Sequence, residues 1–296
     1  MSSSGGSFNR IDPDLKQEYV ADLSFFVERE IMSNLGVRAG YVRKTEHNNW
    51  QEFQVGRSYA GYSDARSFPD PGPDGRPNTT DDGAAFVAYD YPAGVTIPAS
   101  RTLLLNRAEI EDWDQNIDVT INKRMSNRWS LLSSFLYNWD HSKGSPQTPN
   151  AERFNELDLT GWAFKFFGTY QAPWGITVNP VLRVQQGPNM ARVVSVTLRT
   201  GTLSYQAEAP GTYRGENVSI FDIAAERRIR LGGHRSADVF VAAFNALNSN
   251  AATGQDATVG VRTAVLGGES IQYQRFLRRT AILPPRVFRF GVKLAF

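Results

Sequence analysis

The chain has 296 residues, of which 41% are apolar and 12% aromatic, and its mean hydropathy is -0.38. The formal charge of +2 is too small for a nucleic-acid-binding protein, which presents a clustered basic face. The lack of cysteine excludes disulfides, thiolate metal sites and cysteine nucleophiles. No apolar run reaches the roughly 18 residues of a membrane-spanning helix, so any crossing of a membrane would use strands.

The N-terminal residues are rich in serine and glycine and contain no secretory signal peptide, which would pair a basic start with an apolar stretch. We expect residues 1–17 to be a flexible lead-in on the outer side. Residues 18–296 are expected to form a single all-β unit.

Nine segments alternate apolar and polar residues with the period of two that predicts β-strands. Residues 115–123 are typical, because Ile117, Val119 and Ile121 fall on one face and Asp118 and Thr120 on the other. In chain order the segments are 19–31, 35–44, 115–123, 129–139, 162–170, 176–184, 221–229, 237–247 and 285–296. Residues 237–247 are apolar on both faces, so their orientation is ambiguous.

The connections between these segments alternate between short and long. Short turns are expected at residues 32–34, 124–128, 172–174 and 232–235, and long polar loops at 46–107, 141–160, 187–216 and 248–284. This alternation is typical of outer-membrane barrels, which have brief periplasmic turns and extended outer loops. It places the C-terminus at the short-turn end. The first and ninth strands would run in the same direction, so we expect further strands upstream to complete an antiparallel barrel.

Aromatic residues lie at the strand ends. A soluble β-sandwich has no physical reason to collect aromatics there, whereas a lipid-facing sheet places them at both membrane interfaces. The residues in such positions are Tyr41, Trp129, Trp139, Trp162, Tyr170 and Phe296. The opposite face carries Asp22, Glu28, Arg38, Asp118, Lys165, Arg183, Asp222, Glu226, Arg228 and Lys293, which suit a wet lumen. The predicted fold class is therefore all-β, an antiparallel up-and-down transmembrane β-barrel of which about nine strands are present.

Five short motifs follow one another along the chain: RIDPDLKQEYVADLSFFVERE, DPGPDGRPNTTDDG, FKFFGTYQAPWGITVNPVLRVQQGP (164–188), VFVAAFNALNSNAATG (239–254) and the terminal VFRFGVKLAF. The last three resemble, in turn, the strand, turn, strand unit, the penultimate strand and the closing strand of TonB-dependent outer-membrane receptors. The first two are similar to the carboxypeptidase-regulatory-like, Oar-like type of that family.

The resemblance implies a C-terminal barrel segment in the cell outer membrane that contributes to uptake of a siderophore, oligosaccharide or similar nutrient. It implies contact with outer-membrane lipid and recognition of Phe296 by the barrel-insertion machinery. Contact with the TonB complex would require a plug, and this chain carries neither plug nor TonB box. No nucleic-acid partner is expected.

Residues 70–83 are the best candidate for a metal site. Asp70, Asp74, Asp81 and Asp82 offer hard oxygen ligands in a Gly-bearing loop, which suits Ca²⁺, although the spacing is not that of an EF-hand. The alternative is a turn region in which Asp and Asn make local hydrogen bonds. No other cofactor is expected.

The sequence offers no catalytic motif, and an enzyme is not expected. Asp140-His141 at a strand end would be the starting point for a rim-active hydrolase. The long loops carry Trp50, Phe53, Tyr59, Tyr62, Phe68, Tyr89 and Tyr91, which could stack on a ligand or pack together as a lid. The main alternative function is a self-contained structural or ligand-binding protein, lectin-like or adhesin-like, without transport.

Overall fold

The computed structural model describes residues 10–107, 112–266 and 269–296. Its largest element is a sheet of nine antiparallel strands, each hydrogen-bonded to the next large strand along the chain. The strands are β2 (Tyr19–Met32), β3 (Leu35–His47), β8 (Asp112–Ser126), β9 (Trp129–Lys143), β10 (Glu156–Ala172), β11 (Ile176–Gln185), β16 (Val218–Gly232), β17 (Arg235–Phe244) and β22 (Val287–Ala295). The predicted strands and their up-and-down order are confirmed.

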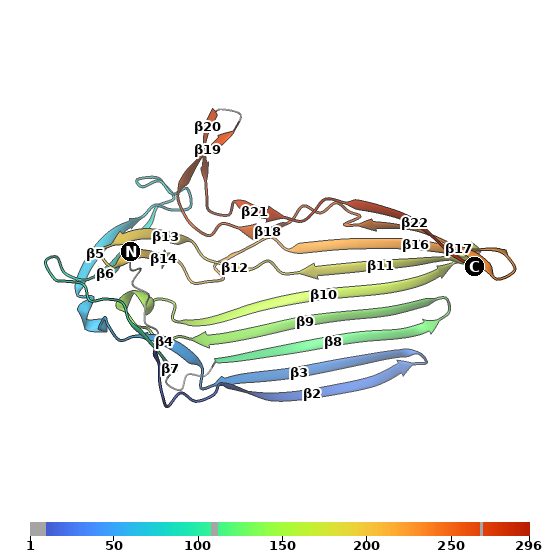
Figure 1. Ribbon diagram of the computed structural model, residues 1–296, viewed down its shortest axis with the longest axis horizontal. Coiled ribbons are helices and arrows are strands. Elements are labelled where there is room, and N and C mark those ends of the chain that lie inside the picture. Colours follow the sequence, from blue (N-terminus) through green and yellow to red (C-terminus); the bar gives the residue numbers. More distant parts are fainter. Residues whose placement is uncertain (1–9, 108–111, 267–268) are drawn as a thin grey trace, which may run out of the picture.

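The short turns gather at one end of this sheet and the long loops at the other (Figure 1). The C-terminus lies at the short-turn end, as the alternation of turns predicts. Asn127 and Arg128, in the turn between β8 and β9, both have positive φ (51° and 68°), and a two-residue turn of this kind matches the twist of the flanking strands. Among the described residues no helix is long and apolar enough to cross a membrane.

Register across the sheet separates the side chains into two faces. Tyr137 pairs with Ile117 on one side and Trp162 on the other, so these three residues share a face. On the opposite face, Thr120, Ser134, Lys165 and Arg183 form a continuous row. Every charged residue predicted for the polar face falls on it, including the ion pairs Arg183–Asp222 (2.9 Å) and Arg228–Asp238 (2.6 Å).

The ambiguous segment 237–247 is resolved by its neighbours. Val239 and Val241 pair with Val292 and Phe290, which places them on the apolar face, whereas Asp238 pairs with Lys293 on the polar face. The strand ends at Phe244, before the predicted end at residue 247, because Asn245 takes a positive φ of 49°.

The sheet is open. Strands β2 and β22 are its two edges, and they run in the same direction. Many apolar side chains of the apolar face are exposed, including Val27 at 71% and Phe290 at 74%. The nine strands thus form an open wall, and many side chains of its apolar face are exposed.

The sequence predicted that the long loops are plain polar connections. The structure shows instead that they contain short strands and most of the buried residues. The first loop holds β4 (Trp50–Gln54), η1 (Tyr59–Gly61), β5 (Asp64–Asp70), β6 (Gly83–Asp90) and β7 (Thr102–Asn106), and the second holds η2 (Pro149–Ala151). The third holds β12 (Asn189–Met190), β13 (Val193–Leu198), β14 (Gly201–Gln206) and β15 (Tyr213–Arg214). The fourth holds β18 (Ala252–Gln255), β19 (Val261–Leu266), β20 (Glu269–Gln274) and β21 (Arg279–Ile282).

Part of the predicted lead-in is ordered against these loops. Arg10 and Ile11 form β1 (Arg10–Ile11), which pairs in parallel with Leu103 and Leu104 of β7. The nine residues before β1 lie outside the described residues.

Candidate functional site

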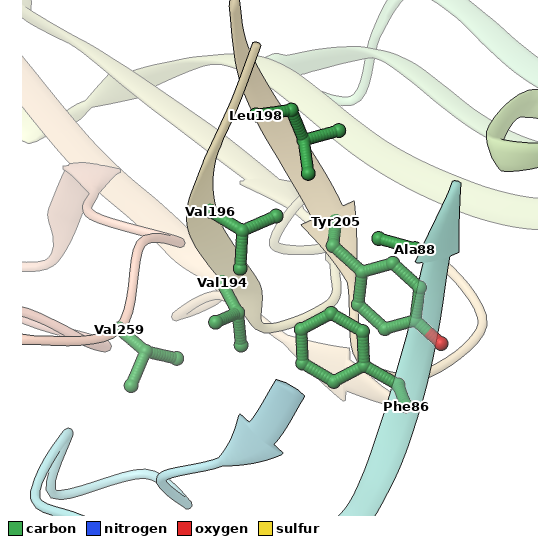
Figure 2. Close-up of a cluster of buried hydrophobic side chains, with 7 residues drawn as sticks. All are labelled: Phe86, Ala88, Val194, Val196, Leu198, Tyr205 and Val259. Carbon is green, nitrogen blue, oxygen red and sulfur yellow. The ribbon is translucent and has the colours of Figure 1, made fainter. Parts of the chain in front are cut away.

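Two hairpins from different loops, β5–β6 and β13–β14, pack together at the long-loop end of the sheet (Figure 1) and form the main buried cluster of the described residues. Strand β6 contributes Phe86 and Ala88, and the β13–β14 hairpin contributes Val194, Val196, Leu198 and Tyr205 (Figure 2). The Phe86 and Tyr205 rings are stacked, with centroids 3.7 Å apart. Val259 of the fourth loop closes the cluster. We call the β5–β6 and β13–β14 hairpins, together with the segments of the long loops that hydrogen-bond to them, the cap.

A buried ion pair joins the two hairpins at one end. The guanidinium of Arg192 donates two hydrogen bonds of 2.9 Å to the two carboxylate oxygens of Asp70. It also donates a hydrogen bond to the Glu208 carboxylate, so one guanidinium bonds to two carboxylates. Arg192 and Asp70 are each 7% exposed at the side chain. These hydrogen bonds raise the pKa of Arg192 against the opposing effect of burial, so the guanidinium stays charged.

Asp90 joins the same hairpins at the other end. Its carboxylate is fully buried and accepts hydrogen bonds from the backbone N–H groups of Tyr91 (2.8 Å) and Arg199 (2.5 Å). Burial opposes ionisation, but these N–H groups outweigh it and lower the pKa of Asp90. The Arg199 side chain in turn donates to the carbonyls of Tyr91, Pro92 and Val95. The hairpins are thus fixed to each other at both ends.

Further contacts tie the remaining loops to the cap. Arg153 of the second loop donates to the carbonyls of Gln206 (3.1 Å) and Ala207 (2.6 Å). In the fourth loop, Val259 donates its backbone N–H to the carbonyl of Val193 (2.8 Å). Glu216 accepts from Arg279 at 2.7 and 2.9 Å. All four long loops therefore belong to one connected structure.

The cap contains a cleft of about 670 Å³ between β6, the η2 turn and β14. This volume is within the usual range of ligand pockets. The polar and charged side chains that line it include one acid and one base from the η2 segment, Glu152 and Arg153. The remaining lining residues are Asp70, Gly83, Ala84, Ala85, Phe86, Val87, Tyr89, Pro149, Asn150, Arg192, Tyr205 and Ala207.

The charged groups at this cleft are held by their neighbours. The Tyr59 hydroxyl donates to Glu152, which raises the pKa of Tyr59 to about 12. Arg153 lies over the Tyr205 ring at 5.0 Å from its centroid, and burial raises the pKa of the Tyr205 hydroxyl.

Asn150 fixes the edge of β6 that borders the cleft. Its side-chain oxygen accepts the backbone N–H of Tyr89 (2.8 Å), and its side-chain nitrogen donates to the Tyr89 carbonyl (2.8 Å). One amide side chain thereby makes the two hydrogen bonds that a neighbouring strand would make.

The four acids of the predicted calcium loop do not share the same hydrogen-bond partners. Asp70 pairs with Arg192. Asp74, Asp81 and Asp82 each place an oxygen within 3.5 Å of the Thr79 hydroxyl (3.5, 2.6 and 3.0 Å). Bonds from Thr79 and from the backbone N–H of Asp74 lower the pKa of Asp81. No group of three or more acidic or histidine side chains in the described residues has the arrangement of a metal site, so calcium binding stays a prediction.

The aromatic residues of the first loop do not form one stacking surface. Phe68 packs on Phe86, with ring centroids 5.9 Å apart, and Tyr62 meets Tyr91 edge to face at 4.9 Å. Tyr89 lines the cleft. Trp50 is 40% exposed and donates its indole N–H to the Lys16 carbonyl. Tyr62, Phe68 and Tyr91 therefore pack on other rings, whereas Trp50 and Tyr59 stay about 40% exposed.

Asp140 and His141 do not form a catalytic pair, because adjacent strand residues point to opposite faces. His141 lies on the apolar face, stacks on Trp113 and contacts Asp158 at 2.8 Å. Phe296 lies at the short-turn end of the sheet and is 89% exposed.

Arg192, Asp90, Glu208 and Arg153 were missed by the sequence reasoning. The segment RVVSVTLRTGTLSYQ, residues 192–206, alternates valines and leucines with small polar residues around a Thr-Gly turn. This pattern indicates a β-hairpin and could have located the core of the cap.

The molecule is thus an all-β protein with an open up-and-down sheet and a structured cap of loops at one end. No protein-family model and no curated protein matches the sequence. Among solved structures, a crystal structure of a Pseudomonas aeruginosa FadL homologue is similar at 10% identity, covering 94% of this chain and 67% of that chain, with a TM-score of 0.21.

Proposed function

We propose that this chain forms the C-terminal wall of a TonB-dependent-receptor-like β-barrel in the outer membrane, where its cap captures a nutrient on the outer side for uptake. The observation that carries the proposal is the division of the nine-stranded sheet into one exposed apolar face and one charged face. A broad exposed apolar face is unfavourable in water and is expected to contact lipid or protein.

The direction of the strands supports the assignment of sides. The short turns, which are typical of the periplasmic end, lie together at one end of the sheet, and the cap lies at the other (Figure 1). Trp129 and Tyr170 pair at the short-turn end of the apolar face, and Trp139 lies toward the cap end of the same face. This distribution fits interfacial aromatic belts.

The opposite face fits a hydrated lumen. Arg183 is half exposed at the side chain and pairs with Asp222. Arg228 is 70% exposed and pairs with Asp238. Exposed charged pairs of this kind contribute little to stability and are stable only in contact with water. In the proposed mechanism a ligand leaves the cap and passes along this face.

The proposal is tested by quenching tryptophan fluorescence with lipids brominated in their acyl chains. In single-tryptophan variants reconstituted into vesicles, Trp162 on the apolar face is expected to be quenched strongly. Trp50 in the first loop serves as the matched control and is expected to be quenched weakly. Equal quenching of the two residues would contradict the membrane assignment, and a protein that stays monodisperse without detergent would also contradict it.

A further inference from the structure

Strand β6 has an open edge beside the cleft. Tyr89 directs its backbone N–H and C=O away from β5, because both groups bond to the Asn150 side chain. In an antiparallel pair, the N–H and C=O of one residue point to the same side, and the side alternates from one residue to the next. The backbone groups of Val87, two residues earlier, therefore point toward the same edge as those of Tyr89.

The backbone N–H and C=O of Val87 are accessible from the cleft. Within the described part of the chain, β6 pairs with β5 alone, and Val87 takes part in no hydrogen bond across the open edge. Val87 is 48% exposed and lines the cleft. Between Phe86 and Gly83 the register is irregular, and β6 has one residue more than β5.

The Asn150 side chain, which bonds to the Tyr89 backbone, indicates which kind of ligand the edge of β6 accepts. The Asn150 side chain is a primary amide, and it supplies one donor and one acceptor, as a peptide bond does. An extended peptide placed in line with this amide would offer the same pair of groups to Val87. Addition of a strand to an open sheet edge is an established way for proteins to bind extended peptides.

We propose that the cleft binds an extended peptide segment, which adds to the open edge of β6 and forms main-chain hydrogen bonds with Val87. The peptide would lie between β6 and the segment that carries Glu152 and Arg153, which offer one charge of each sign to its side chains. The inference rests on the proposed function for the placement of the cleft on the outer side, and it names the class of ligand captured there.

The test uses the full chain in detergent micelles and a fluorescein-labelled pentapeptide of alternating serine and valine, blocked at both ends, with binding followed by fluorescence anisotropy. The wild-type chain is expected to bind it. The same peptide N-methylated at every residue lacks main-chain donors and is expected to bind at least about tenfold more weakly. Maltopentaose is expected not to displace the probe, and displacement by this sugar would overturn the peptide assignment.

Two proline variants locate the binding edge. Val87→Pro removes the N–H that faces the cleft and leaves the hydrogen bonds between β5 and β6 in place, since proline is tolerated where a strand's N–H is unpaired. We expect at least about a tenfold loss of affinity. Ser67→Pro is the matched control, because Ser67 lies directly opposite Val87 on β5 and its N–H points away from the cleft. Its affinity is expected to stay within twofold of wild type.

Equal affinity of the Val87→Pro variant and the wild type would overturn the proposal, as would equal binding of the methylated and unmethylated peptides or no binding by the wild type at millimolar peptide. The methylated peptide keeps the test valid if a variant fails to fold. Lipid quenching of Trp162 reports on the membrane assignment separately, so failure of the peptide proposal and failure of the proposed function are distinguishable.

Discussion

Arg192 and Asp70 lie 122 residues apart in the chain, yet they form a two-point ion pair that is almost fully buried. The pair connects the third loop to the first, and Glu208 completes it. Removal of one partner from a buried ion pair leaves an uncompensated charge, which is usually more costly than the pair itself is stabilising. Because this ion pair joins the two loops, we expect their hairpins to unfold together as one cooperative unit.

Arg192→Ala is accordingly expected to destabilise the cap by about 3–5 kcal/mol, because it leaves Asp70 and Glu208 without the cation that they share. Hydrogen exchange should increase in β5, β6, β13 and β14 and stay slow in β8 to β10. Arg66→Ala, which removes the partly exposed pair with Asp64 at 2.7 Å in the β5–β6 hairpin, is the control, with an expected effect under about 1 kcal/mol. Unchanged exchange in the two hairpins of the Arg192→Ala variant would contradict the cooperative cap.

Phe86→Ala is expected to destabilise the cap by about 3–5 kcal/mol, because it removes a buried ring from between Phe68 and Tyr205. Val87→Ala, one residue along the same strand and on the exposed face, is expected to change stability by less than about 0.5 kcal/mol. Denaturant unfolding followed through tyrosine fluorescence checks both variants. Similar effects of the two substitutions would show that the cluster in Figure 2 does not stabilise the cap.

The cap is expected to lose stability in acid. The backbone N–H of Ala252 and the guanidinium of Arg279 lower the pKa of Glu216, and the backbone N–H groups of Arg199 and Tyr91 lower that of Asp90 despite its burial. A lowered folded-state pKa means that the unfolded chain binds protons more readily. The contribution of these acids is therefore fully present above the unfolded values of about 4 and is lost as pH falls through the folded-state values.

Hydrogen exchange of the cap measured between pH 3 and pH 6 checks this dependence, after correction for the intrinsic rate. In Glu216→Gln the acid-induced loss is expected to shrink in the fourth loop and persist at the two hairpins. A cap whose protection is constant down to pH 3 would contradict the assigned role of these carboxylates.

Calcium binding by the 70–83 loop stays a prediction from the sequence. Addition of millimolar Ca²⁺ is expected to raise the thermal stability of the wild type, because Asp74, Asp81 and Asp82 bring three carboxylates to Thr79. The rise is expected to be lost in Asp74→Ala and in Asp82→Ala. Magnesium, which requires a stricter octahedral arrangement, is the control ion. If calcium leaves the melting temperature of the wild type unchanged, the loop is only a turn region.

Phe296 is expected to act in membrane insertion, as the resemblance to TonB-dependent receptors implies. Phe296→Ala should lower the amount of folded protein in the outer-membrane fraction several-fold, measured by resistance to protease, without changing the stability of protein refolded in detergent. The side chain is 89% exposed, so it contributes little packing that its removal could disturb. Phe290→Ala, another exposed aromatic on the last strand, is the control for a general loss of apolar surface.

The large sheet was predictable because its information is local. Alternation with a period of two marks each strand, and the lengths of the connections determine strand direction. The faces follow from the same alternation, so Ile117 and Tyr137 could be assigned to one side and Lys165 and Arg183 to the other before their pairing was known.

The cap could not be predicted in the same way, because the contacts that build it join distant parts of the chain. The sequence places Asp70 beside the acids of its own loop, whereas its ion-pair partner Arg192 lies in another loop. Asp90, Arg153 and Asn150 carry no motif, and each has a function in the structure only because a different loop supplies the backbone group that it bonds.

The strands, their order, the two faces of the sheet and the position of the C-terminus follow from periodicity and connection length, so they can be read from the amino-acid sequence. Only the folded chain shows that the four long loops form one cap, that Arg192 pairs with Asp70, and that one edge of β6 is open beside a cleft. Burial and hydrogen-bond pairing depend on which segments meet in space, and a local sequence pattern does not contain that information.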